Sequence, residues 1–233
     1  MSEESRIQNI VQNYQNILSL TLKYNQAGTK PNIVVVTKNQ PADLILKVSQ
    51  KIKNPIFGEN RIQEALPKIE FCGTSNISWH FIGYLQRNKV KKVLSKFSMI
   101  ESLDRIKLAK EIEKWASKME KIVNCLIQVD ICQDGSKFGV DPSEEKIKEF
   151  LDKTSSLPHL KINGLMTIAP YVPSKKTRVY FQRMWNLYKN LKTDKSLPSN
   201  VEMKILSMGM SNDYSIALEE GSNCIRLGTA IFG

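Results

Sequence analysis

Short continuous apolar runs alternate along the chain with longer segments in which apolar residues recur every three or four positions. The short runs are typical of buried strands, and the longer segments are typical of helices with one apolar face. The predicted strands cover residues 33–37, 56–57, 80–85, 97–100, 125–129, 162–168, 203–206 and 225–227. The predicted helices between them cover residues 41–53, 61–69, 86–94, 105–121, 143–155, 175–191 and 211–220. A further helix over residues 5–26 precedes the first strand, and Gly28 and Pro31 end it.

This alternation predicts parallel strands joined by helical crossovers. Eight strands match a (β/α)8 barrel, an α/β fold, and we expect residues 1–233 to form one such domain with an extra N-terminal helix. The alternative is an open, doubly wound sheet, which would be expected to carry a glycine-rich turn after its first strand if it bound a dinucleotide. The residues at that place, TKNQPADL, include no glycine. The barrel is therefore favoured, and functional residues are expected just after its strands.

The composition is that of an ordinary globular protein, with 41% hydrophobic and 24% charged residues. No apolar stretch is long enough to span a membrane, and the polar N-terminus MSEESRIQNI has no apolar signal core. We therefore expect a cytoplasmic protein. The four cysteines, Cys72, Cys125, Cys132 and Cys224, form no CxxC pair, and we expect neither a disulfide nor a metal site.

The net charge of +11 raises the question of nucleic-acid binding. The excess is mostly lysine, spread along the whole chain, and its densest cluster is RNKVKKVLSK at residues 87–96. No nucleic-acid-binding motif accompanies this cluster, and no series of aromatic residues is present to stack on bases. The charge predicts a solvated lysine-rich surface and no nucleic-acid partner.

Lys38 stands directly after the first predicted strand, in which residues 33–37 are all apolar or β-branched. A lysine at such a place can extend to solvent. In a barrel, however, the position opens into the central cavity, where we expect the ammonium to be desolvated and the amine to be available as a nucleophile. A lysine amine forms Schiff bases with carbonyl groups, either of an aldehyde substrate or of pyridoxal phosphate. The residue by itself leaves a lysine aldolase and a pyridoxal phosphate protein open.

The segments after the last two predicted strands favour a bound anion. In SMGMSNDY, a glycine lets the backbone approach a ligand, Ser211 is the expected N-cap of the next helix, and Asp213 lies in its first turn. The segment RLGTA offers Gly228 and Thr229. A phosphate site formed after strands seven and eight recurs in barrels. Such a site opposite a lysine fits pyridoxal phosphate, and it fits a phosphorylated sugar aldehyde as well.

Arg226 lies inside the apolar segment CIRLG, where a guanidinium requires a partner. One candidate partner is the ring nitrogen of pyridoxal phosphate, and the alternative is a carboxylate across the barrel. An arginine does not give up its proton at ordinary pH, so a ring nitrogen that faced it would stay a neutral acceptor. The cofactor would then be a weak electron sink, and carbanion chemistry would be restrained.

Other polar residues near strand ends have structural interpretations. Ser102 and Asp104 are predicted to be helix N-caps, and Asp130 a turn residue of the same type. His80 lies early in its predicted strand, where it is either a site residue or a buried histidine with a structural partner.

Five segments together resemble the pyridoxal phosphate homeostasis proteins: VVVTK, FGENRIQEALPK, WHFIGYLQRNK, GLMTIAP and LSMGMSNDYSIALEEGSNCIRLGTAIFG. They follow the family's order from about residue 30 to the last residue. The resemblance implies a barrel of the alanine racemase N-terminal-domain type with pyridoxal 5′-phosphate (PLP) on Lys38. Thr37 stands where the family usually has serine, and Phe138 and Arg61 are further departures, which concern contacts at the rim of the site.

The resemblance also implies the remaining residues of a cofactor site. Arg226 would face the pyridine nitrogen, and Asn60 and His80 would lie beside the cofactor. The residues around the phosphate or the ring would be Ser207, Gly209, Met210, Ser211, Gly228 and Thr229.

Two classes of function follow, a non-catalytic PLP carrier and a racemase-like enzyme. A racemase needs a base on each face of the substrate, and Lys38 serves only one face. In alanine racemases the opposing tyrosine comes from a second domain of the partner subunit, whereas this sequence ends at Gly233, directly after the last predicted strand. Tyr84 and Tyr171 are the remaining candidates, and nothing in the sequence singles them out.

We therefore expect no catalytic residues and a monomeric carrier that acts in PLP (vitamin B6) homeostasis. As the family resemblance implies, it would supply the cofactor to apo-enzymes without turnover. A low-activity racemase-like enzyme is the alternative, and a lysine aldolase is a more distant one.

Overall fold

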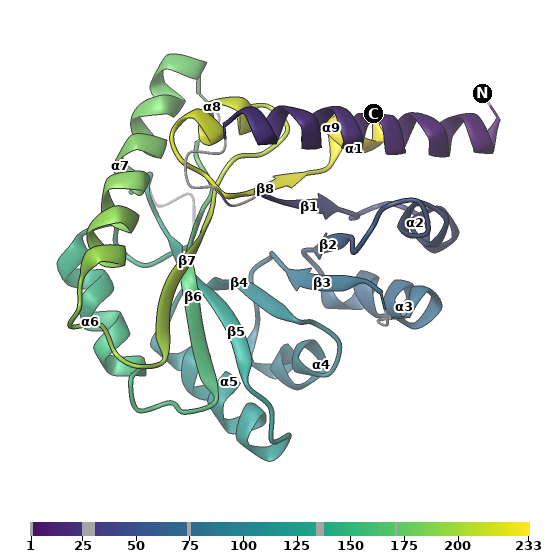
Figure 1. Ribbon diagram of the computed structural model, residues 1–233. Helices are drawn as coiled ribbons and strands as arrows, with labels where there is room; N and C mark the ends of the chain where they lie inside the picture. Colours follow the sequence, from purple (N-terminus) through teal and green to yellow (C-terminus); the bar gives the residue numbers. More distant parts are fainter. Residues whose placement is uncertain (1, 25–30, 74–75, 134–137, 171) are drawn as a thin grey trace.

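The computed structural model describes residues 2–24, 31–73, 76–133, 138–170 and 172–233, which form a closed barrel of eight parallel strands in sequence order (Figure 1). This confirms the predicted (β/α)8 barrel. The strands are β1 (Asn32–Val36), β2 (Ile56–Glu59), β3 (Ser78–Phe81), β4 (Met99–Leu103), β5 (Val123–Val129), β6 (Leu160–Thr167), β7 (Val201–Ser207) and β8 (Cys224–Leu227). The helices are α1 (Glu3–Lys23), α2 (Ala42–Ser49), α3 (Ile62–Cys72), η1 (Arg87–Lys89), α4 (Val90–Leu94), α5 (Ile106–Lys118), α6 (Glu144–Thr154), α7 (Ser174–Thr193), α8 (Tyr214–Glu219) and α9 (Thr229–Phe232).

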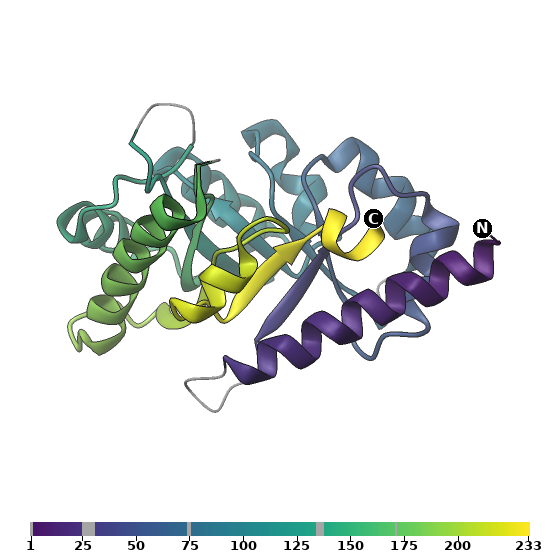
Figure 2. The same ribbon diagram turned by 90° about the horizontal axis from the view of Figure 1, so that it is seen from above.

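Pairing between β1 and β8 closes the barrel, and the two strands run side by side in Figure 2. Val34 pairs with Arg226, and Val35 pairs with Leu227. The apolar residues of β1 form a continuous run because strands of a parallel sheet are covered on both faces. This pairing brings Arg226 next to the strand that precedes Lys38, although the two residues lie near opposite ends of the chain.

The helices that connect the strands lie outside the barrel and pack one apolar face against it (Figure 1). In α5 the buried residues are Leu108, Ala109, Ile112 and Ala116, which share one face at helical spacing. The largest fully buried side chains include Trp79, Phe57 and Phe81, and the rings of Phe57 and Trp79 meet edge to face at 5.4 Å. The predicted helices are thus held by the apolar stripe that made them recognisable.

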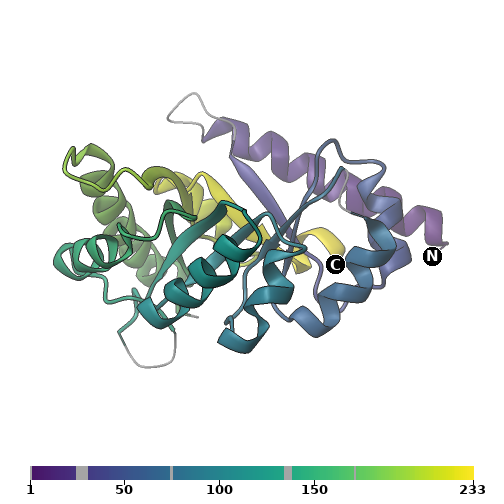
Figure 3. The same cartoon turned by 90° about the horizontal axis from the view of Figure 1, so that it is seen from below.

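Helix α1 lies along the outside of the barrel beside β1 and packs near α2 and α9 (Figures 1 and 3). It begins after Ser2, whose hydroxyl accepts a bond from the Ser5 amide at 3.2 Å. The Asn13 side chain donates to the carbonyl of Ile231 at 3.1 Å, which ties α1 to the C-terminal helix. The predicted helix over residues 5–26 is thus present, but residues 25 and 26 lie outside the described residues.

Backbone and side-chain hydrogen bonds together hold the seam between β7 and β8, where the strands pair in register at Ser207 and Cys224. The Ser222 hydroxyl lies 2.7 Å from the carbonyl of Met208 and 3.0 Å from that of Cys224. The Asn223 side chain accepts from the amide of Leu206 at 2.7 Å. These contacts fix the start of the segment after β7, which forms part of the candidate site.

The structure shifts two of the predicted strands. β3 ends at Phe81, not at residue 85, because the chain leaves the sheet to pass Asn60 at close range. A Cβ atom on Gly83 would lie 2.1 Å from the Asn60 carbonyl oxygen, so only glycine fits there. β4 covers Met99–Leu103, later than the predicted 97–100, and this places Glu101 and Ser102 within the strand.

The N-cap predictions for Ser102 and Asp104 are wrong. The buried Ser102 hydroxyl donates to the Gly83 carbonyl at 2.6 Å, and Arg105 is the N-cap residue of α5. Asp104 forms an ion pair with Arg105. Asp130 does accept a bond, from the amide of Gln133 at 3.2 Å, as expected for a turn residue.

Among the helices of the described residues, none combines the length and the apolar character that crossing a membrane requires. The same part of the chain contains no group of three or more His, Cys, Asp or Glu side chains arranged to hold a metal ion. Cys125 and Cys224 are buried, and this burial raises the pKa of both thiols well above the ordinary value.

Candidate functional site

A cavity of about 310 Å³ opens at the C-terminal ends of β1 and β8. Its walls come from the end of β1, the segment after β6, the β7–α8 loop and the β8–α9 connection. Six of the predicted site residues line it: Lys38, Met210, Ser211, Arg226, Gly228 and Thr229. This is the end of the barrel at which (β/α)8 proteins carry their functional sites.

Lys38 follows the end of β1 and lies on the wall of this cavity. The chain turns immediately after it, where the Gln40 amide donates to the Thr37 carbonyl at 3.1 Å and Asn39 has φ 61°. Asparagine tolerates this left-handed conformation better than most residues. The expectation that the Lys38 ammonium is desolvated is wrong, since Lys38 is exposed. Its position at the cavity, not burial, therefore distinguishes it from the other lysines.

The β7–α8 loop approaches the cavity through Gly209, which has φ 99°. A Cβ atom there would lie 2.6 Å from the Cβ of Ala217, so the close packing of loop and helix requires glycine. The carbonyl of Gly209 accepts from the amide of Arg226 at 3.0 Å. The loop and β8 are thereby joined directly beside the cavity.

Ser211 and Asp213 have other roles than those predicted. α8 starts at Tyr214 with Asp213 as its N-cap residue, and the Ser211 hydroxyl instead accepts from the Ala230 amide at 3.1 Å. The Asp213 carboxylate lines the cavity and accepts from the Met210 amide at 2.6 Å. Burial raises the pKa of Asp213, and the Met210 hydrogen bond and the Arg226 charge oppose this rise.

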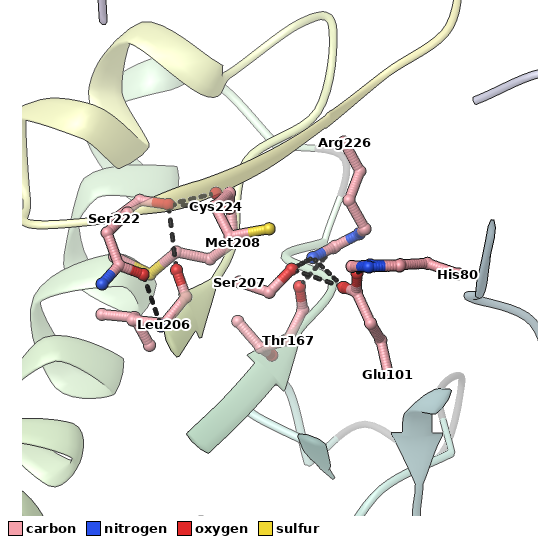
Figure 4. A network of polar contacts seen from close by, with 10 residues as sticks. His80, Glu101, Thr167, Leu206, Ser207, Met208, Ser222, Cys224 and Arg226 are labelled. Carbon is pink, nitrogen blue, oxygen red and sulfur yellow. Dashed lines mark hydrogen bonds and ion pairs between the residues drawn. The ribbon is translucent and has the colours of Figure 1, made fainter. Parts of the chain in front are cut away.

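Arg226 is 4% exposed, and its guanidinium enters a network of buried polar groups (Figure 4). It donates to the Ser207 hydroxyl at 2.6 Å and to the Thr167 carbonyl at 2.7 Å. The Ser207 hydroxyl in turn donates to Glu101 Oε2 at 2.7 Å. The structure thus contains the carboxylate partner that was one of the two alternatives for Arg226, with 4.0 Å between Arg226 Nη1 and Glu101 Oε2.

Glu101 is fully buried on β4, and His80 Nδ1 lies 2.7 Å from its Oε1 (Figure 4). Burial alone would raise the pKa of Glu101, but the His80 hydrogen bond and the charges of His80 and Arg226 outweigh it and lower the pKa. The network therefore keeps a carboxylate behind Arg226, and the carboxylate fixes the guanidinium in place. The sequence offered a signal for Glu101, because a glutamate inside an apolar strand needs a cation as much as Arg226 needs an anion.

Four predicted site residues do not line the cavity. Ser207 and His80 belong to the buried network, and Gly209 contributes the carbonyl that binds the Arg226 amide. Asn60 lines a separate hollow of about 430 Å³, together with Tyr84 and Lys89 among others.

Tyr84, one of the two tyrosines considered as a second base, is not among the described residues that line the cavity. Tyr84 is 45% exposed, and its ring lies 4.5 Å from the Arg105 guanidinium and 4.3 Å from the Phe138 ring. Tyr171 lies outside the described residues.

The sequence and the fold match known proteins over nearly the whole chain. Residues 6–233 match the model of the alanine racemase N-terminal domain. A solved alanine racemase from Clostridium difficile has the same fold with a TM-score of 0.70 at 16% identity, and the match covers 97% of this chain and 56% of the racemase chain. The chain belongs to the alanine racemase N-terminal domain family.

Curated relatives define the group within that family. A pyridoxal phosphate homeostasis protein from Aquifex aeolicus is 43% identical over 76% of both chains, and one from Pasteurella multocida is 36% identical over 97% of this chain and 96% of its own. The structure of PipY from Synechococcus elongatus with PLP bound superposes with a TM-score of 0.82 at 30% identity, over 96% of this chain and all of PipY. This chain is a member of the pyridoxal phosphate homeostasis protein family, as the sequence segments predicted.

Proposed function

We propose that this protein binds PLP as a Schiff base on Lys38 and holds it for supply to other proteins, without catalytic turnover. The observation that carries the proposal is the position of Lys38 and the buried Arg226 on the walls of one cavity, at the functional end of the barrel. PLP bound in the related PipY and the names of the curated relatives support the same ligand. The protein would act inside the cell on the vitamin B6 supply.

The residues present fit this cofactor. The cavity volume of about 310 Å³ lies near the lower end of the range of small-molecule sites, roughly 300–1,000 Å³. Arg226 lies on the wall as a donor that cannot lose its proton, which suits a ring nitrogen with a lone pair. Met210, Ser211, Gly228 and Thr229 lie on the wall formed after β7 and β8, where barrels recurrently bind phosphate.

The proposal of a carrier rests on what these residues do to a bound cofactor. PLP supplies an electron sink that stabilises a carbanion, and it does so best when its ring nitrogen is protonated. Arg226 is held by Ser207 and the Thr167 carbonyl and, with Glu101 nearby, remains a cation that has no proton to give. Among the described residues that line the cavity, no tyrosine stands opposite Lys38 as a second base.

A low-activity racemase-like enzyme is the second candidate, and the fold shared with alanine racemase favours it. The two candidates differ in what happens to the α-proton of a bound amino acid. When the PLP-loaded protein is incubated with L- and D-alanine in deuterated water, we expect no rapid exchange of this proton. Rapid exchange would contradict the carrier function and support the racemase-like enzyme.

The attachment to Lys38 is tested by borohydride reduction of the PLP-loaded protein. We expect the visible absorbance to disappear and peptide mass mapping to find a pyridoxyl group on Lys38. A pyridoxyl group on Lys89, with Lys38 unmodified, would contradict the proposal. Transfer is tested with an apo-enzyme that depends on PLP, and we expect it to regain activity faster than the free release of PLP from this protein allows.

A further inference from the structure

Thr37, the residue directly before Lys38, has each of its polar groups bonded to a partner on another element. Its amide donates to the Gly58 carbonyl at 3.0 Å, and its hydroxyl donates to Glu59 Oε1 at 2.7 Å. Its carbonyl accepts from Lys68 Nζ at 2.8 Å, in addition to the Gln40 amide. Thr37 is completely buried. Hydrogen bonds from β2 and α3 thus fix the backbone at Thr37 on both sides of the residue.

The partners of Thr37 form a buried ion pair. Lys68 Nζ lies 2.8 Å from Glu59 Oε1, and the residues are 9% and 0% exposed. Glu59 is the last residue of β2, and Lys68 reaches inward from α3. The other carboxylate oxygen, Glu59 Oε2, is buried and has no hydrogen-bond partner among the described residues. Lys68 therefore supplies the charge that makes the burial of Glu59 tolerable.

The bond from Lys68 to the Thr37 carbonyl acts on Lys38 through the covalent chain. A peptide group is planar, so a fixed carbonyl of Thr37 also fixes the nitrogen and the Cα atom of Lys38, from which its side chain starts. No hydrogen bond or ion pair to a described residue holds the exposed amine of Lys38. Among the contacts of the described residues, those of the Thr37–Lys38 peptide group are therefore what fixes the start of the Lys38 side chain at the cavity.

We propose that Lys68 and Glu59 are positioning residues that set the reach of Lys38 toward the aldehyde of the cofactor. The inference rests on the proposed function, since it concerns the covalent step at Lys38. In that step a bond forms between Lys38 Nζ and the aldehyde carbon, and one water molecule leaves. Lys68 and Glu59 do not line the cavity and do not touch the cofactor. They act only through the Thr37–Lys38 peptide group.

The alternative is that this pair only joins α3 to the barrel. The two explanations separate when two ligands are compared, PLP and pyridoxine 5′-phosphate, which has an alcohol in place of the aldehyde and cannot react with Lys38. A purely structural pair would affect both ligands alike. A positioning pair affects PLP alone.

The test measures the dissociation constants of both ligands for Lys68→Met. We expect PLP to bind about tenfold more weakly, as the loss of one charge-assisted hydrogen bond implies, while pyridoxine 5′-phosphate binds as it does to the unchanged protein. Lys68→Arg, which can still donate to both acceptors, should recover part of the PLP affinity. Equal weakening of both ligands, or no weakening of PLP, would overturn the inference.

Lys47→Met is the matched control. Lys47 forms another lysine–glutamate pair, with Glu3 at 2.6 Å, but this pair is exposed and does not share the Lys68 contacts with Thr37 and Glu59. We expect the affinities for both ligands to be unchanged. A loss of PLP affinity as large as that of Lys68→Met would mean that any lost lysine has this effect.

If Lys68→Met does not fold, Thr37→Val and Glu59→Gln test the same inference. Both keep the size of the side chain and disturb the same peptide group, so both should lower the affinity for PLP relative to pyridoxine 5′-phosphate. A folded protein with an unchanged ratio in both variants would overturn the inference. Lys38→Ala tests the proposed function separately: it must abolish the preference for PLP, and a retained preference would contradict the Schiff base itself, whatever Lys68 does.

Discussion

Arg226 and Glu101 lie on opposite strands of the barrel interior with 4.0 Å between Nη1 and Oε2, and the Ser207 hydroxyl bonds to both side chains (Figure 4). Both charges are buried, since the two residues are 4% and 0% exposed. Buried charges persist only when their partners are in place. The cation on the wall of the cavity at the ends of β1 and β8 is therefore held in place by side chains from several strands.

Arg226→Met should destabilise the protein without cofactor by about 3 kcal/mol, because Glu101 stays buried and loses the guanidinium that lies 4.0 Å from its Oε2, while only the His80 contact of the two described cations remains. Urea unfolding followed by circular dichroism measures this change. Arg226→Lys keeps the charge but cannot reproduce both guanidinium hydrogen bonds, to Ser207 and to the Thr167 carbonyl. It should therefore lower the free energy of unfolding by less than Arg226→Met does. A loss below about 1 kcal/mol for Arg226→Met would mean that the ion pair contributes little to the fold.

Glu101→Gln should lower stability at neutral pH by about 1–2 kcal/mol and remove part of the acid sensitivity. The folded pKa of Glu101 is lowered from its ordinary value of 4.5, mainly through His80 and Arg226 acting against burial. The ionised form therefore stabilises the fold above about pH 4.5, and this contribution is lost as the pH falls through the lowered pKa. The stability difference between the two proteins should be constant from pH 7 to pH 5 and shrink below that, and a constant difference down to pH 3 would contradict the assignment.

Lys38→Ala should leave the free energy of unfolding of the protein without cofactor within about 0.5 kcal/mol of the unchanged protein, because Lys38 is exposed. The same variant should lack the visible absorbance of bound PLP after incubation with the cofactor. Thermal unfolding and absorbance spectra measure the two effects. A large loss of stability would show that Lys38 has a structural role which its exposure does not indicate.

Gly209→Ala should destabilise the protein by about 2–3 kcal/mol, since the new Cβ adds a clash to the strain of a left-handed backbone. Its φ is 99°, and the Cβ would lie 2.6 Å from the Cβ of Ala217. Gly73→Ala is the matched control, because Gly73 has φ 76° but none of the described residues lies within 4 Å of an added Cβ. Gly73→Ala should lower the free energy of unfolding by only about 1 kcal/mol. Equal losses for the two variants would mean that backbone strain alone decides the effect.

Much of the fold and part of the site follow from local patterns in the chain. The continuous apolar runs predicted the eight strands, because a parallel barrel covers both faces of each strand. The glycines and small polar residues after β7 and β8 predicted where the chain would approach an anion. The errors fall where a long-range contact moves a boundary, as at Gly83, where the passage beside Asn60 ends β3 early.

The sequence by itself determined the barrel, the family and the place of Lys38 at the end of a strand. Only the tertiary structure decided that Ser207 meets Glu101 across 106 positions of the chain, and that Lys68 bonds to the Thr37 carbonyl across 31. It also separated the residues on the cavity wall from His80 and Ser207 behind it. The physical reason is that an apolar run or a glycine acts on its own neighbourhood, whereas the partner of a buried charge depends on how the strands and helices of a closed barrel are placed against one another.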